Sequence, residues 1–213
     1  MKTILLCGLL SFGGAVLAAD APKPLYENNF EKAEVGKAPE DLMILGGEFV
    51  VKREGTNQFL ELPGAPLDSF AAQFGPAIKT NVAVVARISG TSKGRRAPTF
   101  GVGLGGVSGW KLQASPGKKA VELLKDQEIK ATMSHDWKSG AWLQMRLEIR
   151  QVKAGVWKIE GKVWAQGEVE PKAAQIMFDE TEEPTQGRAS ILGSPIAGTP
   201  IWFDDLRVEA LAN

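Results

Sequence analysis

The sequence predicts an all-β protein with the architecture of a two-sheet antiparallel jelly-roll sandwich. Nearly every apolar run past residue 25 alternates with a period of two, and Gly or Pro separates the runs at short intervals. No segment shows a convincing apolar helical face. Many short strands of this kind favour two packed sheets. The sequence shows no linker, repeat or low-complexity tract, so we expect residues 19–213 to form a single domain.

The first residues predict a signal peptide over residues 1–18. Lys2 supplies a positive charge, an apolar stretch covers residues 4–17, and Val16-Leu17-Ala18 is typical of a cleavage site. The stretch is shorter than the roughly 20 residues of a membrane-spanning helix. We therefore expect a secreted or periplasmic protein with no membrane span. Cleavage removes Cys7, the only cysteine, so the mature chain can form no internal disulfide.

The charge balance argues against nucleic acid or an anionic membrane as a partner. The chain has 25 basic and 25 acidic residues, and loss of Lys2 leaves the mature chain with one excess acid. A protein that binds a polyanion normally carries a basic excess. Residues 92–96 form a short basic run, which we expect to be a loop tip.

The clearest strands form a hairpin. Apolar and polar residues alternate over residues 142–152, Lys153-Ala154-Gly155 turns the chain, and the alternation resumes over residues 157–165. Such a hairpin buries one face and leaves the other in water. Residues 67–74 could form one short helical turn. Further strands are expected at residues 48–53, 58–62, 82–88, 99–104, 110–114, 121–124, 128–133, 175–178, 189–192 and 201–208.

The polar face of this hairpin is the candidate ligand-binding surface. Alternation places Arg146, Glu148, Lys162 and Trp164 on it, and Trp142 joins them. Such a surface suits a sugar, because an aromatic ring can lie under the pyranose ring while charged or amide groups reach its hydroxyls. The alternative is a solvated face of cross-strand ion pairs, with Trp142 covering a sheet edge.

The closing strand, residues 201–208, contains a carboxylate where strands seldom have one. Strict alternation puts Trp202, Asp204, Leu206 and Val208 on one face, so Asp204 is expected to point where the apolar side chains point. A buried carboxylate needs a partner. The partner is either a set of backbone N–H donors from a neighbouring segment or a bound cation.

Residues 101–106 spell G-x-G-x-x-G. A dinucleotide site needs these glycines between a strand and a helix N-terminus, but residues 109–113 predict another strand. We instead expect Phe100, Val102 and Leu104 to enter the core, with the glycines leaving the other face bare. Glycine in a strand often marks the close approach of another backbone or of a ligand.

Several short motifs follow one another between residues 26 and 208: Tyr26-Glu27-Asn28-Asn29-Phe30, Gly36-Lys37-Ala38-Pro39, Phe100-Gly101-Val102-Gly103-Leu104, Gly140-Ala141-Trp142, Gly187-Arg188-Ala189 and Trp202-Phe203-Asp204-Asp205-Leu206-Arg207-Val208. Their order resembles the concanavalin A-like lectin/glucanase superfamily. The likeness is greatest to the laminin-G-like and 3-keto-disaccharide-hydrolase-type domains of secreted bacterial proteins. The resemblance implies a β-sandwich that binds or hydrolyses a sugar, and it specifies the fold better than the activity.

No catalytic residue can be assigned from the sequence. Retaining glucanases of this fold carry carboxylates at alternate strand positions, and no such run occurs here. The acidic runs at residues 168–170 and 179–183 lie beside turns, where carboxylates are usually solvated. His135, the only histidine, is expected in a loop, and three consecutive residues such as Ser134-His135-Asp136 cannot form a catalytic triad.

The resemblance offers a structural calcium ion as the partner of Asp204. Related jelly rolls hold calcium between their first and last strands, which makes Asp204, Asn29 and Glu34 candidate ligands. One histidine and no mature cysteine argue against zinc or copper. The alternative is that Asp204 accepts N–H groups of the N-terminal strand. In either case Asp204 would join the last strand to the first.

Three functions remain open at this point. The first is an exported, non-catalytic module that binds carbohydrate or a cell-envelope component. The second is a sugar hydrolase of the 3-keto-disaccharide-hydrolase type, as the resemblance implies. The third is a structural or protein-interaction module.

Overall fold

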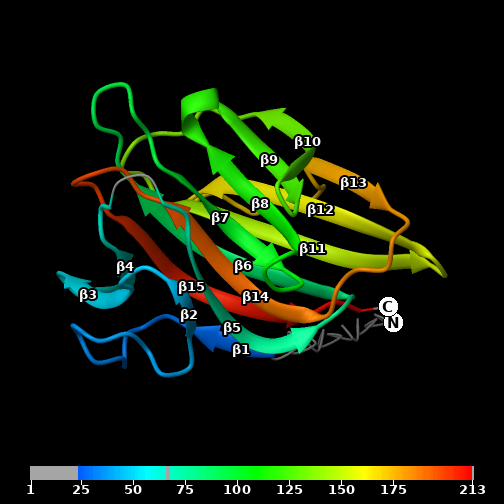
Figure 1. Ribbon diagram of the computed structural model, residues 1–213, viewed down its shortest axis with the longest axis horizontal. Coiled ribbons are helices and arrows are strands. Elements are labelled where there is room, and N and C mark those ends of the chain that lie inside the picture. The colour runs from blue at the N-terminus through cyan, green and yellow to red at the C-terminus, as the bar shows by residue number, and fades with distance from the viewer. Residues whose placement is uncertain (1–23, 66–67, 213) are drawn as a thin grey trace, which may run out of the picture.

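The protein is a sandwich of two antiparallel sheets packed around one hydrophobic core, as the sequence predicts (Figure 1). The computed structural model describes residues 24–65 and 68–212. The predicted signal peptide lies outside these residues. Within them, no helix is long and apolar enough to cross a membrane.

The eight-stranded sheet holds the closing strand and the predicted hairpin. Its strands follow the order β13-β12-β11-β6-β15-β4-β3, and β1 also pairs with β15. The bounds are β1 Tyr26–Asn28, β3 Val50–Glu54, β4 Asn57–Leu62, β6 Val82–Gly90, β11 Leu143–Lys153, β12 Val156–Ala165, β13 Ile176–Glu180 and β15 Ile201–Ala210.

The seven-stranded sheet holds the glycine-rich strand at its centre. Its order is β10-β9-β8-β7-β14-β5-β2. The bounds are β2 Met43–Gly46, β5 Phe70–Ile78, β7 Thr99–Leu104, β8 Trp110–Ser115, β9 Ala120–Lys125, β10 Glu128–Ser134 and β14 Gly187–Ser194. A single turn of 3-10 helix, Pro116–Lys118, joins β8 to β9.

Alternating side chains on the inner faces of the two sheets fill the core. In β11, Leu147 and Ile149 are buried against the other sheet while Arg146 lies on the outer face. The predicted hairpin is confirmed, since β11 pairs antiparallel with β12 and Arg146 lies opposite Lys162. Each sheet therefore has one outer face, and these two faces carry the polar groups that could form a site.

The sequence does not predict three of the observed strands, β1, β2 and β5. In place of a helical turn at residues 67–74, Phe70–Ile78 forms β5 with Ala72 and Phe74 buried. The outward positions of β5 carry Ala71, Gln73 and Gly75. Two of these outward residues are small and not polar, so the outward and inward positions differ little in hydrophobicity. The period of two is therefore hard to detect in the sequence.

The closing strand changes phase at a bulge, which corrects the prediction that Trp202, Asp204, Leu206 and Val208 share one face. The pairing of β15 with β6 shifts register between Asp204 and Arg207, and Asp205 takes a left-handed φ of 49°. Leu206 and Val208 consequently belong to the core, whereas Trp202 and Asp204 lie on the outer face of the eight-stranded sheet.

The glycine-rich strand β7 has the predicted orientation. Phe100, Val102 and Leu104 are buried in the core, and Gly101 and Gly103 face outward. A Cβ atom at residue 101 would overlap the carbonyl oxygen of Leu112 on β8. The close approach at Gly101 is therefore that of a neighbouring backbone.

Replacing Gly101 with Ala is expected to lower the free energy of unfolding by about 2 kcal/mol or more, because β7 and β8 must separate to admit the methyl group. Gly117→Ala is the matched control, since a Cβ there meets no atom within 4 Å, and we expect less than about 0.5 kcal/mol. Urea unfolding of both variants measures the difference. Equal stabilities would show that the strands do not touch at Gly101.

Candidate functional site

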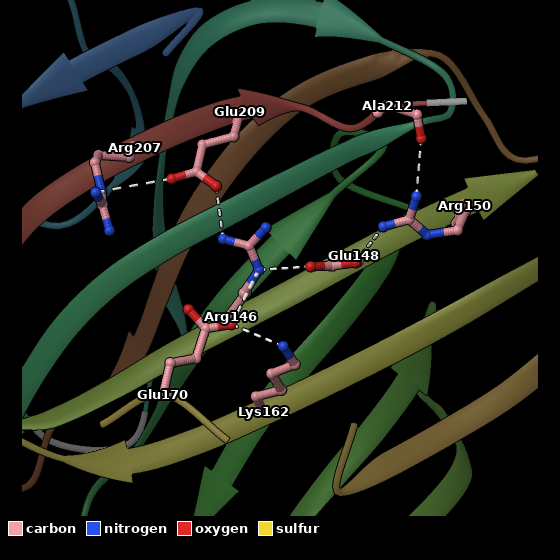
Figure 2. Close-up of polar contacts among 8 residues, drawn as sticks. All are labelled: Arg146, Glu148, Arg150, Lys162, Glu170, Arg207, Glu209 and Ala212. Carbon is pink, nitrogen blue, oxygen red and sulfur yellow. Dashed lines mark hydrogen bonds and ion pairs between the residues drawn. The ribbon is translucent and has the colours of Figure 1, made fainter. Parts of the chain in front are cut away.

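The predicted binding face carries a connected network of ion pairs (Figure 2). The guanidinium of Arg146 donates to Glu148 at 2.5 Å through Nε and to Glu209 on β15 at 2.6 Å through Nη1. Arg150 donates to the second oxygen of Glu148 at 3.2 Å, and the ammonium of Lys162 donates to Glu170 at 2.8 Å. These contacts link β11, β12 and β15 across the outer face of the eight-stranded sheet.

Three of the predicted ligand-binding residues are thus already paired within the protein. The side chains of Arg146 and Glu148 are only 11% and 9% exposed. Burial raises the pKa of Glu148, but Arg146 and Arg150 outweigh it and hold this pKa below the usual value. Arg146, Glu148 and Lys162 therefore offer few free hydrogen-bonding groups to a sugar, and their binding role remains a prediction.

The other two predicted residues, Trp142 and Trp164, line a hollow at one end of the eight-stranded sheet. It has a volume of about 300 Å³, and Trp137 from the segment before β11 also lines it. We call it the tryptophan hollow, and its other lining residues are His135, Asp136, Lys138, Ala141, Leu143, Val163, Ala165, Glu168 and Gln175. The structure thus brings together the two predicted tryptophans and adds a third, which the sequence does not single out because it lies outside a strand.

Asp204 is buried, and protein donors surround its carboxylate. The Oδ2 atom accepts from Arg87 on β6 at 2.5 Å and from Asn57 at 3.0 Å, while Oδ1 accepts the backbone N–H of Asp205 at 2.7 Å. Arg87 also lies 2.9 Å from the carboxylate of Asp205 and 4.8 Å above the ring of Trp142. These contacts join β4, β6 and β15. They correct the expectation that Asp204 bonds to the N-terminal strand.

The three candidate calcium ligands are not brought together. Asn29 and Glu34 line a large open hollow beside β1, and Glu34 pairs with Lys37 at 2.9 Å. Asp204 is not among the residues of that hollow. Within residues 24–65 and 68–212, no group of three or more His, Cys, Asp or Glu side chains could hold a metal ion. The first strand does pair with the last, but through backbone bonds such as those between Tyr26 and Val208.

The acidic runs are engaged in ion pairs. Lys125 donates to Glu180 at 2.8 Å and to Glu182 at 2.6 Å, and Glu170 accepts from Lys162. His135 follows β10, as expected for a loop histidine. Partial burial lowers the pKa of His135, and this effect outweighs the negative charge of Asp136, which raises it. Neither run places two free carboxylates across a cavity.

A second hollow lies on the outer face of the seven-stranded sheet, and we call it the polar groove. The register of the strands aligns Gln73 on β5, Ser190 on β14, Gly103 on β7, Lys111 on β8 and Leu124 on β9 in one cross-strand row. The groove has a volume of about 280 Å³. Because residue 103 has no side chain, the surface along this row is most recessed at its centre, between Ser190 and Lys111.

Two polar side chains in the groove are buried without a protein partner. Gln73 is 8% exposed and Ser190 is 5% exposed. Neither side chain makes a hydrogen bond to any part of the chain that the structure describes. Their polar atoms are not sealed from solvent, unlike the buried unpartnered atoms elsewhere in the described chain, so they open into the groove with their hydrogen-bonding capacity free. These groups are therefore placed to bond with something that enters the groove.

The groove offers both donors and acceptors. The Gln113 amide nitrogen donates to Ser115 at 3.1 Å, which leaves its carbonyl oxygen available, and Lys111 makes only a long 3.4 Å bond to the Asp126 carbonyl. Phe70 and Leu192 add apolar surface. The sequence did not predict a role for Gln73 or Ser190, although the bare glycines of β7 were a usable signal. Cross-strand register was needed to show which side chains flank them.

No protein-family model and no curated protein matches the chain. Among solved structures, it is similar to a Bacillus subtilis protein of unknown function with a galectin-like fold (TM-score 0.60, 14% identity, 88% of this chain and 96% of that one). It is also similar to the carbohydrate-binding module CBM66 from Bacillus subtilis (TM-score 0.55, 8% identity, 79% and 95%).

A third similar structure is the catalytic domain of the glycoside hydrolase family 131 protein from Coprinopsis cinerea (TM-score 0.57, 7% identity, 88% and 94% of the two chains). At such identities the likeness shows the fold alone, a galectin-like β-sandwich. One fold thus occurs in a binding module and in an enzyme, so the function has to be argued from the site.

The Asp204 centre predicts a pH dependence of stability. Burial raises the pKa of Asp204 to about 6 from 3.8, although Asn57 and Arg87 oppose the shift. The folded protein therefore holds this proton more tightly than the unfolded chain, so the contribution of Asp204 to stability is greatest below pH 4 and is lost as the pH rises through 6. The expected loss for this group is on the order of 3 kcal/mol.

Asp204→Asn should abolish that part of the dependence, whatever it does to absolute stability. Urea unfolding of both proteins at pH 4, 5, 6 and 7 compares the slopes. Parallel slopes for the two proteins would show that Asp204 does not titrate in this range.

Proposed function

We propose that the protein is a carbohydrate-binding module and that the polar groove holds the sugar. The observation that carries the proposal is the pair of buried, unpartnered side chains, Gln73 and Ser190. A sugar hydroxyl both donates and accepts a hydrogen bond, and so do a carboxamide and a hydroxyl group. The likeness to the module CBM66 supports the same class of ligand.

The groove favours an uncharged sugar. Its charged side chains are Lys111 and Asp126, which carry opposite charges. Its volume of about 280 Å³ is at the lower end of the range for ligand pockets, which suits one or two sugar units. Phe70 and Leu192 provide apolar surface for the C–H face of a sugar ring.

The proposal is binding without hydrolysis. Glycoside hydrolysis needs two carboxylates that flank the scissile bond. Among the described residues that line the groove, Asp126 is the only carboxylate. The nearby Glu122 accepts from Ser115 at 2.6 Å and from Lys118 at 2.8 Å, and it lies outside the lining.

The signal peptide predicted over residues 1–18 further supports an exported protein. Glycans of the cell envelope or of the surroundings would then be its ligands.

The proposal is tested with Gln73→Met, which keeps the length of the side chain but removes its hydrogen-bonding groups. Because Gln73 has no partner within the protein, this variant should melt within a few degrees of the wild type. Binding of a neutral oligosaccharide should weaken at least tenfold, as expected for loss of a buried hydrogen bond.

The measurement is a glycan array followed by calorimetry with the best neutral oligosaccharide. Gln151→Met is the matched control, because Gln151 is exposed on β11 in the other sheet. The proposal fails if the wild type binds no neutral glycan, or if Gln73→Met binds as well as the control.

A further inference from the structure

The tryptophan hollow is a second candidate site, and it shares no lining residue with the polar groove. Three half-buried tryptophans line it: Trp137 and Trp142 from the segment between β10 and β11, and Trp164 near the end of β12. Contiguous apolar surface of this kind often marks a ligand-binding or interaction site. The arrangement calls for a ligand with flat apolar faces.

Trp142 is held rigidly in place. Arg87 lies 4.8 Å above its ring and is itself fixed by the carboxylate of Asp204 at 2.5 Å and by the carbonyl oxygen of Asn57 at 2.7 Å. An arginine stacked on an indole and bound on its other edge cannot swing away freely. The ring is therefore pre-organised, and a ligand that stacks on this aromatic group loses little free energy in ordering it.

The aromatic cluster continues beyond the hollow to the partly exposed ring of Trp202, with Phe59 buried beside it. The ring of Trp142 lies 6.3 Å from that of Trp202 and 6.1 Å from that of Phe59, and the rings of Phe59 and Trp202 are 4.8 Å apart. Trp202 and Phe59 belong to β15 and β4, so the rings extend across the strand direction on the outer face of the eight-stranded sheet. An occupant larger than one sugar ring would reach from the hollow toward Trp202.

The polar groups at the hollow indicate an uncharged occupant. Asp136 is paired with Lys119 at 3.5 Å, and the remaining charged side chains, Lys138 and Glu168, have opposite signs. The Gln175 carbonyl oxygen accepts the Val163 N–H at 2.7 Å. Its amide nitrogen bonds to no described residue, which leaves two N–H donors for a ligand.

We infer that the tryptophan hollow and the adjoining Trp202 ring form a second binding site, which takes the chain of a neutral polysaccharide. Sugar rings stack on tryptophan through their C–H faces and bond to amides through their hydroxyls. The site rests on residues separate from the polar groove. The domain would then bind a polymer at two places, which raises its retention on an insoluble or concentrated glycan.

The test is affinity electrophoresis in gels that contain a soluble neutral glucan, mannan, xylan, galactan or fructan. At least one polymer should retard the wild type. Trp164→Ala should weaken that retardation at least tenfold, whereas Trp164→Phe, which keeps a ring, should retain most of it. Met177→Ala is the control, because Met177 is exposed on the same sheet outside the hollow. Thermal melts confirm that each variant is folded.

Adding Gln73→Met to both proteins separates the two proposals. If the second site exists, Trp164→Ala has the same effect in the Gln73→Met background, even if the groove proves to bind nothing. The inference is overturned if none of the five polymers retards the wild type, or if Trp164→Ala is retarded as strongly as the wild type in every gel. A folded Trp164→Phe that behaves like Trp164→Ala would also contradict stacking on this ring.

Discussion

A polar group taken out of water needs a partner, and this constraint explains both the closing strand and the ion-paired outer face of the eight-stranded sheet. Asp204 shows how the protein meets it. Its carboxylate, with a side chain only 1% exposed, receives donors from Arg87, Asn57 and the backbone of Asp205. The bulge at Asp205 makes this possible, because it turns Asp204 to the outer face while Leu206 and Val208 stay in the core. Three neighbouring strands are thereby joined at one point.

The two outer faces of the sandwich differ in whether their polar side chains are paired within the protein. On the eight-stranded sheet, Arg146, Glu148 and Glu209 pair with one another, so that face is satisfied internally (Figure 2). On the seven-stranded sheet, Gln73 and Ser190 are buried beside a bare glycine strand and bond to no described residue. A polar group whose hydrogen-bonding capacity is free in a concave surface is available for recognition of a ligand. This contrast is the physical reason for assigning the sugar to the groove.

Much of the fold follows from sequence patterns, because a period of two is a local property. The hairpin of β11 and β12 and the inward side chains of β7 could be predicted in this way. Strand β5 could not, since alanine and glycine at its outward positions weaken the pattern. The phase of the closing strand was predicted wrongly, because a single residue at a left-handed φ reverses the alternation. Asp is enriched at such φ values, but a single Asp in a strand does not by itself predict a bulge.

The site was harder to predict than the fold. Sequence alternation correctly grouped Trp142 with Trp164, yet whether Arg146 is free or paired depends on Glu209, which is 63 residues away. The groove depends on register across β5, β14, β7 and β8, which no local pattern contains. Only the bare glycines of β7 indicated from the sequence that something approaches this face.

The most direct test of the central claim is an NMR titration that follows the side-chain amide of Gln73. The probes are neutral gluco-, manno-, galacto-, xylo- and fructo-oligosaccharides, added in turn to the ¹⁵N-labelled protein. We expect one of them to shift the Gln73 side-chain signals together with the backbone amides of Gly101 and Gly103, while the Gln151 side chain is unaffected. If the Gln73 signals stay unchanged at the highest concentration of every oligosaccharide, the polar groove is not a sugar site.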